Sequence, residues 1–194
     1  MSRRLFIMTL ASLAASRLAA ADRAGEAPLW SVLKSGGHFI FLRHALTEPG
    51  IGDPPQFRLG DCATQRNLSG KGRADAERLA QAFRARNIPV QAVLSSRWCR
   101  CIDTARLAFE RVKPAPMLDS IFNERENDAR QDKARSVFTL VAGHSGPGNL
   151  ILVTHAQNIQ ELTGVSPAAG EIVVVTLAAP DRFIVIGRLD VSGY

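Results

Sequence analysis

The chain has few cysteines and no long apolar run beyond its first residues. Only three of its 194 residues are cysteine, an odd number, which excludes a small fold built on a disulfide framework. Past the N-terminus every apolar run is short and broken by charge, which excludes a multi-span membrane protein. The composition is 46% hydrophobic and 22% charged, without repeats or low-complexity linkers. The length therefore suits one ordinary globular domain.

The net charge of +6 does not by itself indicate a nucleic-acid surface. Part of the arginine lies in the first segment, and the rest is scattered among acidic residues with no basic stripe and no interleaved aromatics. We therefore expect no nucleic-acid partner. Metal-binding spacings such as H-x-x-x-H and C-x-x-C are also absent from the sequence, so we expect no metal site.

Residues 1–21 have the features of a secretory signal peptide. Arg3 and Arg4 open the segment, an apolar run follows at 5–15, and three alanines end it. An amphipathic helix of the fold is the alternative, but the apolar run lacks a polar face. Arg3-Arg4 also resembles a twin-arginine signal, so the Sec and twin-arginine routes both stay open. We expect a mature domain at 22–194, periplasmic or secreted, without stable membrane insertion after cleavage.

The remaining sequence alternates strand-like and helix-like segments. Short apolar runs predict five strands, at 38–42, 90–94, 150–153, 172–177 and 183–186. Between them, helical spacing predicts one helix with Ser69 as its N-cap, a second over 102–112 and a third ending at Ala142. This alternation predicts an α/β fold, a three-layer αβα sandwich with a mostly parallel central sheet.

Polar residues follow three of the predicted strands. Arg43-His44 follows the first, the segment 95–100 follows the second, and Thr154-His155 follows the third. Ligands of such folds bind beyond the carboxyl ends of the strands. We therefore expect two histidines and two or three arginines to meet at one edge of the sheet.

These same segments resemble the signatures of a known family. Leu42-Arg43-His44-Ala45 is similar to the Arg-His-Gly signature of the histidine phosphatase superfamily, which has the phosphoglycerate-mutase-like fold. Residues 95–105 resemble its Ser-Ser-Pro-x-x-Arg-x-x-x-Thr-Ala segment, which aligns Arg100 with the family's arginine, and residues 153–155 match its second histidine. The resemblance extends over about 38–177. The sequence departs from the pattern at Ala45, where glycine is usual, and at Arg97, where proline is usual.

The resemblance implies catalysis through a covalent phosphohistidine. A neutral imidazole can attack phosphorus, and flanking guanidinium groups can bind the phosphoryl oxygens in bidentate fashion. We assign His44 as nucleophile, Arg43 and Arg100 as phosphate-binding residues, and His155 as a donor to the transferring phosphoryl group. A lone histidine is more often a satisfied core residue, but here two histidines converge with arginines.

The general acid is open at this point. The segment 121–125 resembles the Asn-Glu-Arg segment that carries the acid in the phosphoglycerate mutase branch. Glu124 is therefore the first candidate, with Glu126 and Asp128 behind it, and solvated charges before a helix are the alternative. The polar loop at 50–62 is expected to shape the substrate pocket, where Glu48 and Asp53 would repel a second phosphate.

The three cysteines also leave alternatives open. Cys99 and Cys101 are too close to pair with each other. Cys62 could bridge to either of them, or all three could be buried thiols.

Three classes of function fit these observations. The first is an exported phosphomonoesterase acting on a small-molecule phosphate ester without a cofactor. The second is a mutase or a phosphohistidine-protein phosphatase of the same fold, which export disfavours. The third is a non-catalytic phosphate-binding module, which the intact set of two arginines and two histidines disfavours.

Overall fold

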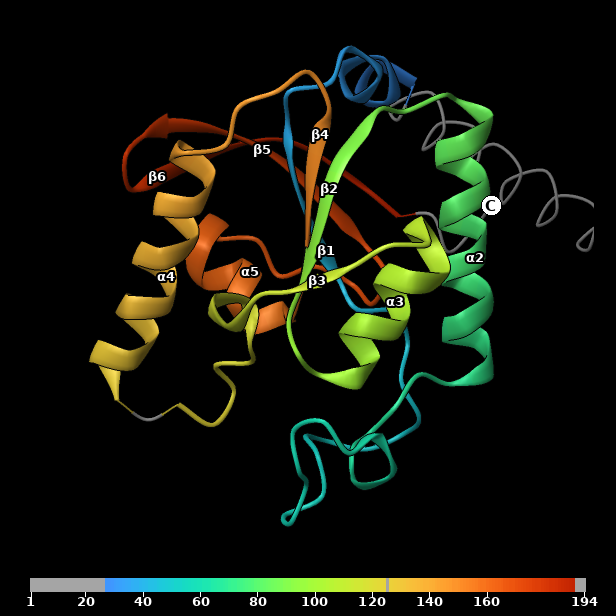
Figure 1. The fold of residues 1–194 in the computed structure, drawn as a ribbon, viewed down its shortest axis with the longest axis vertical. Helices are drawn as coiled ribbons and strands as arrows, with labels where there is room; N and C mark the ends of the chain where they lie inside the picture. Colours follow the sequence, from blue (N-terminus) through green and yellow to red (C-terminus); the bar gives the residue numbers. More distant parts are fainter. Residues whose placement is uncertain (1–26, 125, 191–194) are drawn as a thin grey trace, which may run out of the picture.

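A single six-stranded sheet lies at the centre of the computed structural model, which describes residues 27–124 and 126–190 (Figure 1). The strand order is β3-β2-β4-β1-β5-β6. The strands are β1 (Phe39–Arg43), β2 (Val90–Ser95), β3 (Lys113–Pro114), β4 (Asn149–Thr154), β5 (Ile172–Ala179) and β6 (Arg182–Leu189). Strands β1 to β4 are parallel to one another, whereas β5 is antiparallel to β1 and β6 is antiparallel to β5. The α/β class is confirmed, and the sheet is mixed because a β-hairpin forms its last two strands.

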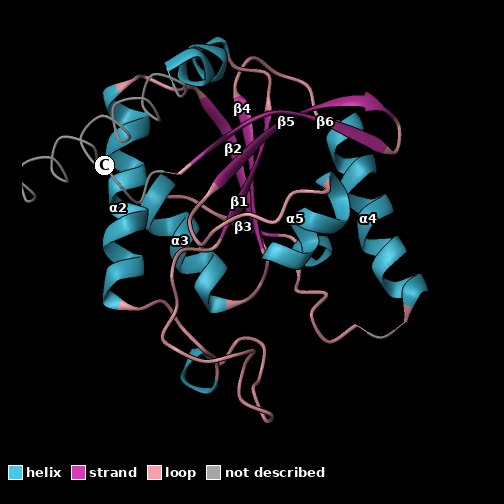
Figure 2. Cartoon of the chain, turned by 180° about the vertical axis from the view of Figure 1, so that it is seen from behind, coloured by secondary structure: helices cyan, strands magenta, loops and turns pink. Residues whose placement is uncertain are grey.

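Helices cover both faces of this sheet (Figures 1 and 2). Helices α2 (Gly70–Ala85) and α3 (Cys99–Phe109) lie on one face, and α4 (Asn127–Ala142) and α5 (Ala156–Thr163) lie on the other. Residues 27–35 are also helical, and two short 3₁₀ helices, η1 (Cys62–Thr64) and η2 (Pro116–Leu118), interrupt the loops. Among the described residues, none of the helices has the length and apolar character that crossing a membrane requires.

The central strands are apolar on both sides because each side faces a helix layer. In β1, Ile40 and Leu42 pack into the core beneath α2 and α3, whereas Phe41 packs into the core with α4 and α5. The same alternation continues in β4 and β5. Strands buried on both faces have continuous apolar runs, which is why these segments could be predicted from the sequence.

Helix α2 begins where the sequence predicts. The Ser69 side chain caps it by accepting a hydrogen bond from the Gly72 backbone N–H. A Cβ atom at Gly72 would lie 1.9 Å from the Leu46 carbonyl oxygen, so only glycine fits there. The segment before α2 is thereby held against the residues that follow β1.

The topology brings the carboxyl ends of three strands to one edge. Arg43 of β1 is in register with Thr154 of β4, and Ser95 of β2 is in register with Val153. A long loop between β1 and α2, residues 45–68, projects at this end of the molecule (Figure 1, bottom) and is called the pocket loop below. The predicted signal peptide at 1–21 lies outside the described residues.

Candidate active site

A cavity of about 420 Å³ opens at this edge of the sheet. All five site residues expected from the sequence line it: Arg43, His44, Arg100, Glu124 and His155. Glu126 and Asp128, the alternative acids, do not line it; they lie at the N-terminus of α4. The wall opposite the sheet comes from the pocket loop, whose residues 50–53 border the cavity.

His44 is a buried, neutral imidazole with one nitrogen fixed. The residue directly follows β1 and is only 6% exposed. Its Nδ1 lies 2.9 Å from the Ala45 carbonyl oxygen. A carbonyl can only accept a hydrogen bond, so Nδ1 carries the proton and Nε2 keeps its lone pair. Burial lowers the pKa of His44 to about 3, and the charges of Arg100, Arg43 and Arg66 act in the same direction. His44 therefore has the protonation state of a nucleophile.

His155 lies beside His44, with ring centroids 5.4 Å apart. It is the N-cap residue of α5 and is 2% exposed. Its Nε2 lies 2.9 Å from the Ser96 hydroxyl oxygen. Burial lowers the pKa of His155 well below its ordinary value, and the proximity of the His44 ring and of the Arg100 charge acts in the same direction. Both rings are therefore neutral before substrate binds.

Three guanidinium groups around the cavity share one arrangement. Nη1 of Arg43 donates to the Pro167 carbonyl at 2.8 Å, Nη1 of Arg100 donates to Asp53 at 2.7 Å, and Nη1 of Arg66 donates to a carbonyl of the pocket loop at 2.5 Å. In each group Nε is buried and has no hydrogen-bond partner among the described residues. Arg78 Nε is buried and unpaired in the same way although Arg78 does not line the cavity, so the indication of an anionic ligand is the presence of three guanidinium groups around one cavity.

Arg66 was not expected from the sequence. It lies in the pocket loop just before the N-cap of α2, and its only sequence signal is a basic residue in a long polar loop. Burial lowers its pKa, as does the charge of Arg100, and Asp53 opposes them. Arg66 is thus the third arginine at the site, a place that the sequence left open.

Asp53 has a different role from the one expected. Rather than standing free to repel a second phosphate, it pairs with Arg100 and accepts hydrogen bonds from the Arg66 backbone N–H at 3.0 Å and Trp98 Nε1 at 2.9 Å. Burial raises the pKa of Asp53, but these hydrogen bonds outweigh it and the net effect lowers the pKa. Asp53 is therefore a fixed carboxylate that orients Arg100.

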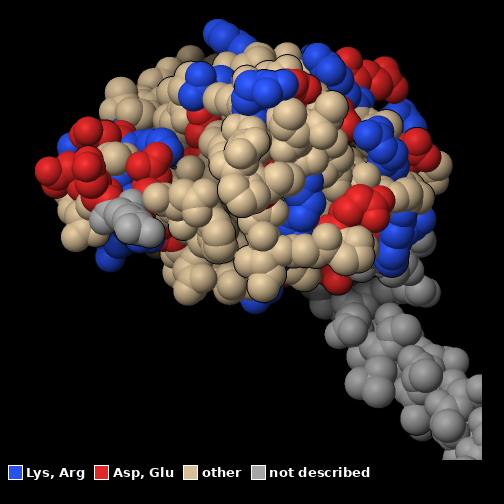
Figure 3. Space-filling view, turned by 90° about the horizontal axis from the view of Figure 1, so that it is seen from below, with Lys and Arg blue, Asp and Glu red and all other residues tan. Residues whose placement is uncertain are grey.

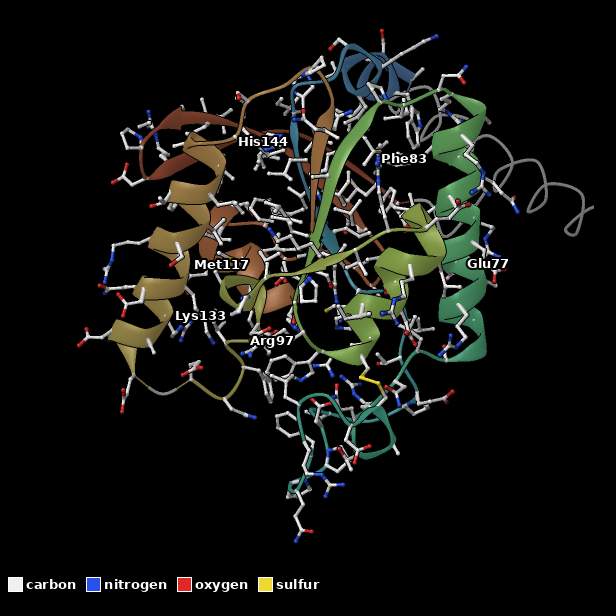
Figure 4. The ribbon with its side chains drawn as sticks, viewed as in Figure 1. Glu77, Phe83, Arg97, Met117, Lys133 and His144 are labelled. Atoms are coloured by element: carbon white, nitrogen blue, oxygen red, sulfur yellow. A yellow bond between two sulfur atoms is a disulfide. The ribbon has the colours of Figure 1, made fainter. Side chains whose placement is uncertain are left out.

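Arg97 is turned away from the cavity. Its Nε donates to Asp119 Oδ2 at 2.7 Å and its backbone N–H donates to Asp119 Oδ1 at 2.8 Å. Asp119 is 3% exposed, and its Oδ1 lies 3.4 Å from the Ser96 hydroxyl that contacts His155. Arg97, labelled in Figure 4, thus supports the carboxylate behind His155 rather than binding phosphate.

Glu124 lies at the cavity and is paired with a lysine. Lys133 of α4, also labelled in Figure 4, donates to its carboxylate at 2.8 Å. A general acid has to carry a proton, whereas this contact is one of the ionised carboxylate. Glu124 therefore has to leave Lys133 before it can protonate a leaving group.

A disulfide bond joins Cys62 of the pocket loop to Cys99 of α3, and it is the yellow bond in Figure 4. Cys101 is a free, buried thiol, and burial raises its pKa to about 12. The structure thus selects one of the alternatives that the sequence left open. The bond holds the pocket loop next to Arg100, the residue that follows Cys99.

The arrangement can bind and attack a phosphoryl group. Guanidinium groups stabilise negative charge on equatorial phosphoryl oxygens, and a neutral imidazole nitrogen can form a bond to phosphorus. Across 27–124 and 126–190, no group of three or more His, Cys, Asp or Glu side chains is placed to hold a metal ion.

The family profile of the histidine phosphatase superfamily (branch 1) matches residues 39–136. This match covers β1, the pocket loop, α2, α3 and Glu124, so most of the site lies within it. The chain therefore belongs to the histidine phosphatase superfamily. That superfamily contains phosphatases and mutases.

Solved structures of phosphatases share the fold. They include the protein histidine phosphatase SixA complexed with tungstate (13% identity, TM-score 0.54, 79% of this chain and 97% of that chain covered). A mycobacterial glucosyl-3-phosphoglycerate phosphatase is 18% identical with a TM-score of 0.54, covering 77% of this chain and 96% of that chain. Phosphoserine phosphatase from Entamoeba histolytica, in complex with 3-phosphoglyceric acid, is 11% identical with a TM-score of 0.57, covering 79% and 96%. No curated protein sequence matches the chain significantly.

Proposed function

We propose that this protein is an exported phosphomonoesterase that hydrolyses phosphate esters through a covalent phosphohistidine on His44. The observation that carries the proposal is the neutral His44, whose Nδ1 is held by the Ala45 carbonyl. It lines the same cavity as the guanidinium groups of Arg43, Arg66 and Arg100.

The reaction takes place in two steps. His44 Nε2 attacks phosphorus, an Nε2–P bond forms, and the P–O bond to the alcohol breaks. Glu124 donates a proton to the departing alkoxide, and His155 donates a hydrogen bond to the transferring phosphoryl group. Water then gives a proton to the Glu124 carboxylate and attacks phosphorus, the Nε2–P bond breaks, and phosphate leaves with His44 neutral and Glu124 protonated again.

Charge balance explains why a third arginine accompanies Asp53. A phosphate monoester dianion and Asp53 together carry three negative charges, and Arg43, Arg66 and Arg100 carry three positive ones. With only Arg43 and Arg100, the two arginines of the resembled motif, two positive charges would face three negative ones, and one negative charge would have no counterpart. We therefore propose that Arg66 binds the phosphoryl group together with Arg43 and Arg100.

A trapped phosphoenzyme tests the chemistry. Rapid quenching with ³²P-labelled substrate should give an acid-labile, base-stable adduct in the wild type and none in His44→Ala. His38→Gln is the matched control and should keep the adduct, because His38 lies just before β1 and does not line the cavity. An adduct that persists in His44→Ala assigns the nucleophile elsewhere. Phosphate binding without any adduct or turnover would favour the non-catalytic alternative.

Export is tested on the mature N-terminus. The protein recovered from the periplasm of an expressing bacterium should begin after Ala21 by mass spectrometry. Replacing Arg3 and Arg4 by lysine should block a twin-arginine route and leave a Sec route working. Recovery of the full-length chain from the cytoplasm alone would contradict export.

A further inference from the structure

The cavity has two chemically different parts. The charged part contains the two histidines and the three arginines, and it fixes where a phosphoryl group would lie. The ester oxygen of a bound monoester then has to point toward the mouth. Whatever lines the mouth therefore contacts the alcohol part of the substrate.

Four large apolar side chains line this cavity: Ile51, Phe57, Trp98 and Phe122. Ile51 is 91% exposed and Phe122 is 50% exposed, although folding normally leaves large apolar side chains covered. They come from two loops far apart in the sequence, and a Cβ atom at Gly52 would lie 3.5 Å from the Phe122 ring. Apolar side chains that converge on a cavity mouth mark a place where a ligand is bound.

The apolar wall is continuous with the phosphoryl-binding part. The Trp98 ring lies 5.6 Å from the His155 ring on one side and 5.6 Å from the Phe57 ring on the other, measured between centroids. The Trp98 indole N–H is held by Asp53 at 2.9 Å, which fixes the ring in place. A chain that leaves the phosphoryl site beside His155 thus meets the Trp98 and Phe57 rings, and Phe122 and Ile51 are more exposed residues of the same lining.

Among the described residues that line the cavity, neither carboxylate is free. Asp53 is paired with Arg100 and Glu124 is paired with Lys133, so neither is left to bind a cationic group of a substrate. The middle of the face at this end of the molecule is largely uncharged in Figure 3. The other lining side chains, Ser120, Asn123 and Gln157, are polar but uncharged. The surroundings therefore favour an uncharged alcohol whose apolar part contacts the four apolar side chains.

We propose that Ile51, Phe57, Trp98 and Phe122 form a subsite for the alcohol part of the substrate, and that the substrates are monophosphates of apolar alcohols. This inference rests on the proposed phosphatase function. It adds the substrate class, which neither the nucleophile nor the arginines determine.

A homologous series of n-alkyl phosphates, from methyl to octyl phosphate, tests the proposal. Beyond ethyl the leaving alcohols have nearly equal basicity, so the chemical step is comparable and the chain length reports burial alone. We expect kcat/KM to rise up to about fourfold for each methylene that the subsite buries. The rise should stop when the chain extends past Ile51.

Variants locate the effect on this wall. Phe122→Ser should lower the octyl-to-methyl ratio of kcat/KM about tenfold, and Phe122→Leu should restore most of it. Ile184→Ser is the matched control, because Ile184 is 51% exposed on β6 and does not line the cavity. It should keep the wild-type ratio.

The outcomes separate the two proposals. Hydrolysis at equal kcat/KM across the series would overturn the apolar subsite and keep the phosphatase. Efficient turnover of a phosphohistidine-bearing protein, together with equal kcat/KM across the alkyl series, would show that these four side chains contact a protein. That result would also overturn the apolar subsite. Failure to hydrolyse any member of the series, or p-nitrophenyl phosphate, would overturn the phosphatase function itself.

Discussion

At the scale of single residues, the site depends on how side chains are held rather than on which side chains are present. Arg97 and Arg100 lie on the same segment after β2, yet only Arg100 lines the cavity, because Asp119 holds Arg97 on the other side. Arg66 reaches the cavity from a loop that no periodic pattern describes. The partners of each guanidinium therefore decide its role.

The coupling of Arg66 and Asp53 can be measured. Arg66→Met should raise KM for a phosphate ester and Ki for inorganic phosphate by about 10–100-fold, the range for a lost hydrogen bond to a charged group. Asp53→Asn in the same chain should recover part of this loss, because it restores the charge balance with the dianion. A double-mutant cycle on Ki gives the coupling.

Arg58→Met is the control for this cycle. Arg58 lies in the same loop, pairs with Asp61 and has a side chain that is 70% exposed. It should leave Ki unchanged. Strictly additive effects of the Arg66 and Asp53 substitutions would contradict the charge argument.

The role of Glu124 depends on the leaving group. An alkyl phosphate releases a strongly basic alkoxide that needs a proton, whereas p-nitrophenyl phosphate releases a weak base. Glu124→Gln should therefore slow alkyl esters by about 10²–10⁴-fold and p-nitrophenyl phosphate far less. Glu126→Gln, outside the cavity, should change neither rate. Equal slowing of both substrates would assign Glu124 a positioning role.

At the scale of elements, the pocket loop is the part that adapts the common fold to its substrate. It supplies Ile51, Asp53, Phe57 and Arg66 to the cavity, and the Cys62 disulfide attaches it to α3. Arg43, His44, Arg100 and His155 come from strand ends and helix starts, which the sheet holds in place, whereas Phe122 and Glu124 come from the loop before α4. Loosening the loop should therefore affect substrate binding more than the chemical step.

Removing the disulfide tests this division. The Cys62→Ser/Cys99→Ser variant should lose about 4 kcal/mol of unfolding free energy, as expected for a cross-link across 37 residues. Its KM should rise more than its kcat falls. Urea unfolding and steady-state kinetics measure the two effects. Dithiothreitol should reproduce both in the wild type and change nothing in the variant; an insensitive wild type would contradict the disulfide.

At the scale of the whole molecule, two neutral histidines buried at the site make stability depend on pH. Each has a folded-state pKa below its ordinary value, so below about pH 6.5 the unfolded chain binds protons that the folded chain does not. Stability is therefore fully present above pH 6.5 and falls as the pH decreases toward the folded-state pKa.

The magnitude follows from His44. With its pKa lowered to about 3, it alone removes about 2 kcal/mol of unfolding free energy between pH 7 and pH 5, and His155 adds to the loss. Urea unfolding at the two pH values measures the change. The His44→Asn/His155→Asn variant should show a clearly smaller pH dependence. An equal dependence in both proteins would place the titrating groups elsewhere.

The sequence by itself determined the frame of the site. The apolar runs of β1, β2 and β4 predicted buried strands, and parallel strands bring their carboxyl ends to one edge, so Arg43, His44, Arg100 and His155 were expected to meet. Local capping chemistry likewise placed the start of α2 at Ser69. By contrast, α5 was not predicted: it has eight residues, too few to be stable without tertiary packing.

Only the tertiary structure decided the rest. Cys99 and Cys101 are two residues apart on α3 and therefore face different sides of the helix; Cys99 meets Cys62, and Cys101 is buried with Sγ 3.6 Å from His155. Arg66, Asp53 and the apolar subsite come together through loop contacts between residues far apart in the chain. Such contacts depend on side chains that meet only in the folded chain. Periodic patterns of apolar residues predict helices and strands but do not predict these contacts.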